Sequence, residues 1–175
     1  MTVAVVFETH STSEDNETGI ATGWLHGRLS PLGRERAREL GERRRDDGLS
    51  AVFTSDLGRA VETAEIAFAG SSLPRFADPR LRECNYGELN GAREPMTDRL
   101  SHLDAPYPGG ESWRQAVERV SGFLEELRRE RAGERVLVIG HSATRFALDV
   151  VANGRQLEVM MAEPFEWRPG WEYVL

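Results

Sequence analysis

The chain has 175 residues, of which 39% are hydrophobic and 29% are charged, the balance of an ordinary globular protein whose length suits one domain. Its formal net charge of -7 disfavours non-specific binding to nucleic acid, and no apolar run approaches the roughly 20 residues that a membrane helix needs. The single cysteine, Cys84, rules out a disulfide within the chain and fits a reducing compartment. We therefore expect a cytoplasmic protein with neither nucleic acid nor a membrane as a partner.

The first third of the chain predicts a strand, a long loop and a helix. Thr2–Phe7 is a short apolar run rich in β-branched residues, which is typical of a strand buried on both faces. Residues 11–29 are polar, contain glycine and have no helical period, so we expect a loop, and long ordered loops are often functional. Ser30 can cap a helix that begins at Pro31 and continues to about Asp46.

The middle of the chain is less regular. Ala51–Phe53 predicts a second strand, and residues 58–69 have the pattern of a helix. Residues 70–80 contain glycine, serine and two prolines, which predicts a loop with room for a short strand. Residues 81–110 are rich in loop-forming residues, so we expect little regular structure there.

The last third returns to regular elements. Glu111–Arg131 is the clearest helix, because apolar residues recur every three or four positions along one face. Residues 135–139 form a Val-rich strand followed by a helix over 142–151, and residues 165–175 have the pattern of a hairpin with a Pro-Gly turn. The alternation of strands and helices predicts one α/β domain over residues 1–175, built as a three-layer α/β/α sandwich with a mostly parallel central sheet.

Four side chains suited to phosphoryl chemistry follow strand ends or lie in the irregular middle region. His10 follows the first strand, Arg59 follows the second, Glu83 lies in the loop-rich part, and His141 follows the Val-rich strand. An open α/β sheet binds ligands beyond the carboxyl ends of its strands, so these groups could converge on one crevice. A neutral imidazole is a nucleophile near neutral pH, an arginine and a protonated second histidine can hold phosphate oxygens, and a carboxylic acid can protonate a leaving oxygen.

Each of these residues alone has an ordinary structural explanation, but a series of short motifs covers residues 3–150. In chain order the motifs are Thr9-His10-Ser11; Asn16; Thr22-Gly23-Trp24; Leu29-Ser30-Pro31; Ser55 to Ala64 (SDLGRAVETA); Leu81 to Gly91 (LRECNYGELNG); Gly109 to Ser112; and Gly140-His141. In this order they resemble the motifs of the histidine phosphatase superfamily, which is phosphoglycerate-mutase-like in fold. The joint match is highly specific, whereas an isolated Thr-His-Ser would mean nothing.

The resemblance implies an enzyme that hydrolyses a phosphomonoester of a small metabolite through a phosphohistidine at His10. It implies that Glu83 is the general acid and that Arg59 and His141 hold the phosphoryl oxygens, with no metal and no diffusible cofactor. We expect substrate contacts from residues at or beside these motifs, namely Thr9, Ser11, Asn16, Thr22, Gly23, Arg28, Arg82 and Ser142.

The chain departs from the family motifs at four places around the expected phosphate pocket. Thr9 stands where the family has the arginine before the nucleophile, and Ile20 and Cys84 stand where mutases have further arginines. Ser142 replaces the glycine or asparagine that follows the second histidine. The sequence therefore predicts an atypical branch with Thr-His-Ser in place of Arg-His-Gly.

Two nearby arginines, Arg28 and Arg82, could substitute for the missing cations or could be plain surface residues. Whether either arginine reaches the phosphate pocket affects the rate, because a hydrogen bond to a charged group contributes roughly 1.5–3 kcal/mol of stabilisation. Losing one such bond at the transition state slows a step by about 10- to 150-fold.

Two alternatives to a phosphatase stay open at this point. A mutase must protect its phosphohistidine, and the chain is short between Gly91 and Gly109 and lacks the extra arginines of mutases. A non-catalytic protein that binds phosphorylated ligands is the other alternative, with Thr9 as its main support. Residues 12–28 and 92–108 would select the substrate but carry no recognisable code, and a homodimer is compatible with the sequence.

Overall fold

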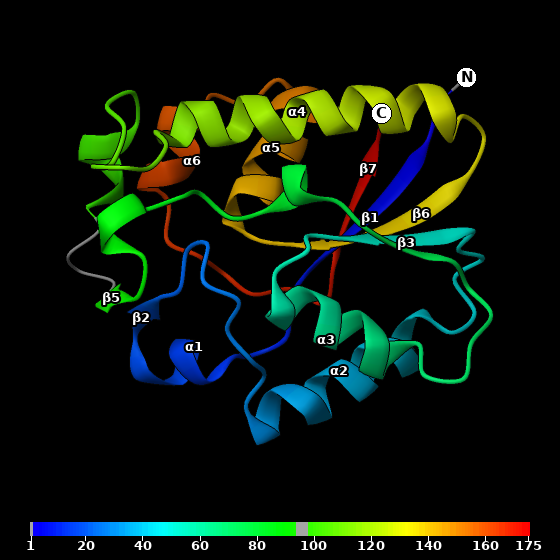
Figure 1. The fold of residues 1–175 in the computed structure, drawn as a ribbon. Helices are drawn as coiled ribbons and strands as arrows, with labels where there is room; N and C mark the ends of the chain where they lie inside the picture. The colour runs from blue at the N-terminus through cyan, green and yellow to red at the C-terminus, as the bar shows by residue number, and fades with distance from the viewer. Residues whose placement is uncertain (1, 94–97) are drawn as a thin grey trace.

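The central sheet has five strands in the order β4-β3-β6-β1-β7, seen nearly edge-on in Figure 1. The computed structural model describes residues 2–93 and 98–175. Four strands run parallel, and they are β1 (Ala4–Thr9), β3 (Ala51–Thr54), β4 (Arg75–Ala77) and β6 (Arg135–Gly140). The fifth, β7 (Trp171–Val174), is antiparallel to β1.

Helices cover both faces of the sheet. Two of them, α2 (Pro31–Arg44) and α3 (Gly58–Ala67), lie on one face. The other face carries α4 (Trp113–Glu130), α5 (Ser142–Asn153) and α6 (Leu157–Ala162). The expected three-layer α/β/α sandwich with a mostly parallel sheet is confirmed. Short 3-10 helices at Pro79–Leu81, Gly87–Leu89 and Arg99–His102 interrupt the irregular middle region.

The helix α4 corresponds to the clearest helical pattern in the sequence, the one over Glu111–Arg131. Along α4 the apolar stripe is buried, including Trp113, Val120 and Leu124. The Ser112 hydroxyl accepts a hydrogen bond from the backbone N–H of Gln115, and the Gln115 side chain accepts one from the backbone N–H of Ser112. This reciprocal cap satisfies N–H groups that the first turn leaves unpaired, so the helix begins at Trp113 rather than at Glu111.

The expectation of a continuous loop over residues 11–29 was wrong. A five-residue helix, α1 (Glu14–Thr18), is capped by Ser13 and Asn16 and ends at Gly19 with a φ of 68°. It is followed by β2 (Ile20–Ala21), which pairs with β5 (Ala92–Arg93) apart from the central sheet. A helix this short has no periodicity to detect, but the capping pair and the left-handed glycine were visible signals.

The prediction of a hairpin over residues 165–175 was also wrong. Residues 165–170 form no strand, and β7 pairs instead with β1 at the start of the chain. The Trp171 ring packs on Phe7 of β1, with ring centroids 5.6 Å apart. The helix predicted to reach about Asp46 ends at Arg44. No helix in the described part of the chain is both long and apolar enough to cross a membrane.

Candidate active site

The carboxyl ends of the neighbouring strands β1 and β6 bring two histidines together. His10 follows β1 and His141 follows β6, and their ring centroids are 5.1 Å apart. The backbone N–H of His10 donates to the carbonyl of Gly140, which continues the ladder between the two strands by one more bond. Both rings line a cavity of about 1180 Å³.

The surroundings of His10 fix which ring nitrogen is free. Nδ1 lies 2.8 Å from the carbonyl oxygen of Ser11, and because a carbonyl can only accept, Nδ1 carries the proton. Nε2 therefore keeps its lone pair. Burial, with the nearby positive charge of Arg59 as the second cause, lowers the pKa of the His10 imidazole to about 3. The ring is thus neutral at physiological pH and has the electronic state that a nucleophile requires.

Arg59, on the first turn of α3, connects both histidines to the loop before α2. Its Nε donates to Nε2 of His10 at 3.3 Å, and one terminal nitrogen lies 3.5 Å from Nδ1 of His141. The remaining N–H groups donate to the carbonyls of Gly23, Leu25 and His26. The guanidinium is almost completely buried, and this burial lowers its pKa. Arg59 therefore ties both histidines to the loop that precedes α2 and places one positive charge beside them.

His141 is neutral too, which corrects the expectation of a protonated second histidine. Burial first, then the charge of Arg59, lowers the pKa of its ring well below the ordinary value. Nδ1 faces the donor Arg59, so Nε2 carries the proton and donates to the Ser55 hydroxyl 2.6 Å away. In this state the ring accepts from Arg59 and presents no positive charge of its own.

The Glu83 carboxylate is held by main-chain N–H groups at the start of α5. It accepts hydrogen bonds from Ala143 at 3.0 Å and from Ser142 at 3.2 Å. A third comes from the neighbouring residue Cys84 at 3.0 Å. The side chain is buried at the cavity wall, so these three hydrogen bonds hold the carboxylate in place there.

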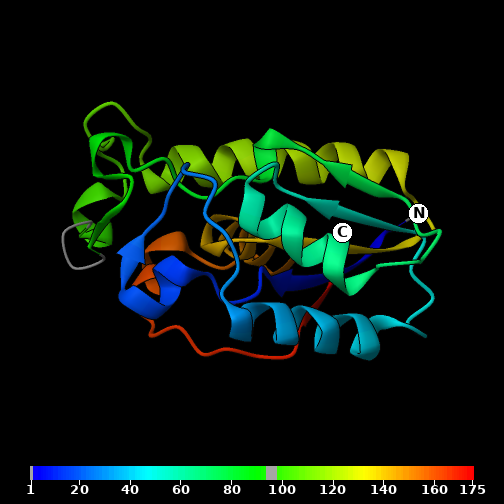
Figure 2. The ribbon, with the colours of Figure 1, turned by 60° about the horizontal axis from the view of Figure 1, so that its bottom comes forward.

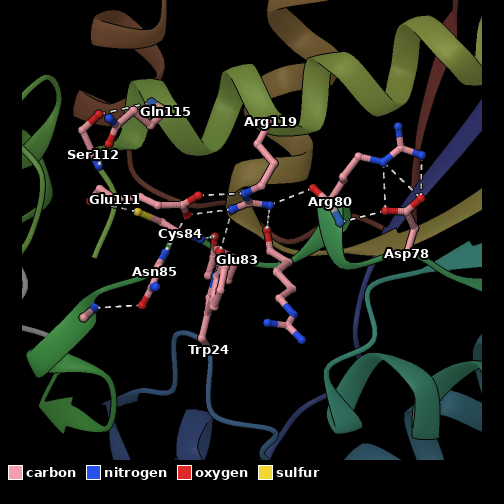
Figure 3. Close-up of polar contacts among 12 residues, drawn as sticks. Trp24, Asp78, Arg80, Glu83, Cys84, Asn85, Glu111, Ser112, Gln115 and Arg119 are labelled. Atoms are coloured by element: carbon pink, nitrogen blue, oxygen red, sulfur yellow. Dashed lines mark hydrogen bonds and ion pairs between the residues drawn. The ribbon is translucent and has the colours of Figure 1, made fainter. Parts of the chain in front are cut away.

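The backbone that carries Glu83 is itself fixed, as Figure 3 shows. Arg119 of α4 donates to the carbonyl oxygens of Arg80, Arg82 and Glu83 while it forms an ion pair with Glu111. From the opposite side, Nε1 of Trp24 donates to the same Glu83 carbonyl at 2.7 Å. This support fixes the position of the acid from two separate parts of the chain. Neither Arg119 nor Trp24 was identified from the sequence as part of the site.

Six of the eight expected substrate contacts line the cavity, and they are Thr9, Ser11, Asn16, Thr22, Gly23 and Ser142. Gly23 has a φ of 54°, and a Cβ there would lie 1.9 Å from the Asn90 side chain, so no other residue fits. The Thr22 hydroxyl donates to the Asp15 carboxylate at 2.8 Å. The side-chain amide oxygen of Asn16 accepts a hydrogen bond from the backbone N–H of Ser13. These contacts orient both side chains within the wall.

The other two, Arg28 and Arg82, do not reach the cavity. Arg28 is exposed and pairs with Glu14 at 2.6 Å. Arg82 forms a two-point ion pair with Asp56 and stacks over the Trp24 ring. Of the two alternatives left open for these arginines, the structure favours surface residues over substitutes for the arginine missing at Thr9, because a carboxylate outside the cavity lining holds each guanidinium.

The cavity has a second wall that sequence reasoning missed. One face of α2 contributes Arg36, Glu39 and Arg43, whose spacing of three, four and seven positions places them on one side of a helix. That spacing was a usable signal. Phe165 and Trp167 also line the cavity from the connection between α6 and β7, and no motif marked them.

The Cys84 thiol, at the position where mutases were expected to have an arginine, is fully buried. Burial, and the charge of Glu83 after it, raises the pKa of this thiol, so it contributes no positive charge and no ready thiolate. Among residues 2–93 and 98–175, no three His, Cys, Asp or Glu side chains are grouped as a metal site would require.

Comparison with known proteins places these features in a family. A family model described as histidine phosphatase superfamily (branch 1) matches residues 6–163. A 2,3-bisphosphoglycerate-dependent phosphoglycerate mutase of Methylobacterium sp. (strain 4-46) is 35% identical over 173 residues, which cover 89% of this chain and 83% of the relative.

Two solved structures share the fold. YhfR of Bacillus stearothermophilus superposes with a TM-score of 0.85 at 26% identity, covering 98% of this chain and 90% of its own. A mycobacterial glucosyl-3-phosphoglycerate phosphatase in complex with VO3 superposes with a TM-score of 0.76 at 25% identity, covering 90% and 84%.

Proposed function

We propose that this chain, which belongs to the histidine phosphatase superfamily, is a phosphomonoester hydrolase that works through a phosphohistidine at His10. Its relatives are phosphatases and phosphoglycerate mutases, so the chain is an enzyme of phosphoryl transfer or hydrolysis acting on phosphorylated small molecules. The observation that carries the finer proposal is the fixed tautomer of His10, whose unprotonated Nε2 lies 3.3 Å from Nε of Arg59.

The first step transfers the phosphoryl group to the protein. Nε2 of His10 forms a bond to phosphorus as the bond between phosphorus and the leaving oxygen breaks. The protonated carboxyl of Glu83 gives its proton to that oxygen, which leaves as an alcohol. The positive charge of Arg59 stabilises the non-bridging oxygens, and the neutral His141 offers them the Nε2–H that now donates to Ser55. Such positioning and charge stabilisation account for most of catalysis in phosphoryl transfer.

The second step returns the enzyme to its starting state. Water attacks phosphorus and gives a proton back to the Glu83 carboxylate, and the bond between phosphorus and Nε2 breaks to release phosphate. Asn16, Thr22 and Ser142 contribute polar groups to the wall around the phosphoryl oxygens. From Thr9-His10-Ser11 we infer an atypical branch with one arginine fewer at this step, and we take residues 1–175 to act as one catalytic domain.

Trapping the intermediate tests the proposal. The protein is mixed with a phosphomonoester labelled at phosphorus, quenched in alkali and digested, and the acid-labile label is mapped. We expect the label on His10 and none in His10→Gln, while His102→Gln, which alters a histidine outside the cavity lining, labels like the parent. Label on any other residue would disprove the proposal, as would the absence of label with a substrate that is turned over.

A phosphoglycerate mutase is the second candidate, supported by the 35% identity to a protein of that name. The two activities differ in the fate of the phosphoryl group. Incubation with 3-phosphoglycerate and catalytic 2,3-bisphosphoglycerate distinguishes them, because a mutase yields 2-phosphoglycerate and a hydrolase yields inorganic phosphate. We expect phosphate from active substrates and no isomerisation.

A further inference from the structure

The cavity that holds His10 is much larger than a phosphoryl group. At about 1180 Å³ it exceeds the usual range of about 300–1,000 Å³ for small-molecule sites. Arg59 contacts both histidines, and Glu83 is held by the residue after His141, so these four groups lie together. The rest of the volume must therefore accept the leaving group, and its walls indicate what that group is.

One wall is aromatic: Trp167 is presented to the cavity, and Phe165 lines it with the Arg145 guanidinium 5.7 Å from its ring centroid. Phe165 and Trp167 line the cavity although 56% and 59% of their surfaces are exposed. They belong to the connection from α6 to β7, which Figure 2 shows running past α1 and the start of α2. Large aromatic rings left open at a cavity are the usual surface for stacking a planar ligand.

This connection is anchored to the strand of the nucleophile. The buried Arg44 donates to the Pro169 carbonyl at 2.7 Å and to the Glu8 carboxylate at 2.9 Å. Glu8 lies on β1, two residues before His10, and is itself almost fully buried. A Cβ on Gly170 would lie 2.0 Å from the Arg44 guanidinium, so the chain must pass close to this ion cluster. The anchor sets the position of the aromatic rings relative to His10.

The charges on the described walls balance. Arg59 and the protonated Glu83 are taken up by the phosphoryl group in the proposed step, and away from them three arginines and three carboxylates line the cavity, namely Arg36, Arg43 and Arg99 with Glu8, Glu39 and Asp98. Arg43 is paired with Glu8 at 3.1 Å, and the two histidines are neutral. A second phosphate or carboxylate on the substrate would meet as many negative as positive groups, so the cavity gives it little electrostatic gain.

We propose that the preferred substrates are phosphomonoesters with an uncharged aromatic leaving group, which stacks on Trp167 and Phe165 while the phosphoryl group lies at His10. The inference rests on the proposed function, because it takes His10 as the phosphate end of the cavity. It predicts poor use of substrates that carry additional anionic groups.

Binding of uncleavable phosphonates tests the ligand class without requiring turnover. Calorimetry compares benzylphosphonate with methylphosphonate, which differ by one phenyl ring. We expect the parent to bind the benzyl compound about tenfold or more tightly, from the apolar area of one buried ring. Trp167→Ala should lose at least about threefold of that preference, the scale of one aromatic pair, and Trp167→Phe should keep it. Val159→Ala, which removes an exposed side chain of α6 outside the cavity lining, should bind like the parent.

Hydrolysis gives the second measurement. 2-Phenylethyl phosphate and ethyl phosphate release alkoxides of similar chemistry, so a difference in kcat/KM reports binding of the ring. We expect a preference for the phenylethyl ester in the parent and its loss in both Trp167→Ala and Phe165→Ala, with 3-phosphoglycerate a poor substrate.

The outcomes separate the two proposals. Equal binding of the two phosphonates by the parent overturns the inference, and so does a preference that survives in both alanine variants. Failure of the parent to bind either phosphonate also overturns it. If benzylphosphonate binds in a Trp167-dependent way while no phosphomonoester is hydrolysed, the proposed function fails and the inferred ligand class stands.

Discussion

Nε of Arg59 lies 3.3 Å from Nε2 of His10, the nitrogen proposed to attack phosphorus. Lysine in place of Arg59 keeps one positive charge but loses the planar set of five donors that also holds three loop carbonyls. We expect Arg59→Lys to lower kcat/KM by about 10- to 150-fold, the effect of one charged hydrogen bond lost at the transition state.

The matched control for this change is Arg28→Lys, since Arg28 is exposed and its guanidinium pairs with Glu14 outside the cavity lining. It should leave kcat/KM within about twofold of the parent, because surface ion pairs contribute little. Parent-like turnover in Arg59→Lys would show that the guanidinium does not act on the phosphoryl group.

Thr9 lines the cavity directly before the nucleophile, and neither Arg28 nor Arg82 takes the place of the arginine that the family has there. Thr9→Arg should therefore raise kcat by about tenfold or more, because it restores a charged hydrogen bond. Steady-state kinetics on the best substrate measures the change, with Thr18→Arg on the exposed end of α1 as the control for added charge. A fall in kcat in a folded Thr9→Arg protein would mean that another group already occupies this position.

The two neutral histidines make the fold sensitive to acid. Burial lowers the pKa of His10 to about 3 and that of His141 well below its ordinary value, whereas both titrate near ~6.5 in an unfolded chain. Below about pH 6.5 the unfolded chain therefore takes up protons that the folded chain does not. This contribution to stability is complete above that pH and declines as the pH falls toward 3.

At pH 5 the protonation of His10 in the unfolded chain alone lowers the free energy of unfolding by about 2 kcal/mol. Urea unfolding of the parent and of His10→Asn at pH 7.5 and pH 5.0 measures it. The variant should lose about 2 kcal/mol less than the parent between the two conditions. The same loss in both proteins would show that His10 is protonated in the folded state at pH 5.

Arg119 is proposed as a positioning residue for Glu83, because it donates to the carbonyls of Arg82 and Glu83 without lining the cavity. In Arg119→Gln the acid should be displaced from the leaving oxygen. Esters of poor leaving groups should then slow by about tenfold or more, whereas aryl phosphates, which leave without a proton, should slow much less. Arg80→Gln, which breaks an ion pair with Asp78 and Glu126 on the adjacent surface, should slow both classes little and equally. An equal slowing of both classes in Arg119→Gln would indicate a purely structural role.

Whether the sequence predicts an element correctly depends on how far apart along the chain its contacting residues lie. The apolar stripe of α4 and the Val-rich run of β6 are local patterns, so both elements were predicted close to their true bounds. β7 was placed in a hairpin because its true partner, β1, lies at the other end of the chain, and no local pattern reports such a pairing. The family motifs located His10, Glu83 and His141, but they could not show that carboxylates hold Arg28 and Arg82 away from the cavity.

The site's aromatic wall had no sequence signal for a related reason. Phe165 and Trp167 lie in an exposed connection without periodicity or motif, and their place at the cavity depends on the contact of Arg44 with Pro169. By contrast, Arg36, Glu39 and Arg43 share one helical face, so their joint position could have been predicted once α2 was known to border the nucleophile.

The order of strands has a consequence for the synthesis of the protein. β1 is made long before its two neighbours in the sheet, β6 and β7, which lie more than 120 residues further along (residues 135–140 and 171–174 against 4–9), and Val3 exchanges two backbone hydrogen bonds with Leu175. Contacts so far apart in the sequence form slowly. A nascent chain on the ribosome therefore exposes the apolar strand that leads to His10 with no partner to pair with. The nucleophile can reach its place beside His141 only after β6 has been translated, so ribosome-bound fragments that end before β6 should be inactive and should depend on chaperones to stay in solution.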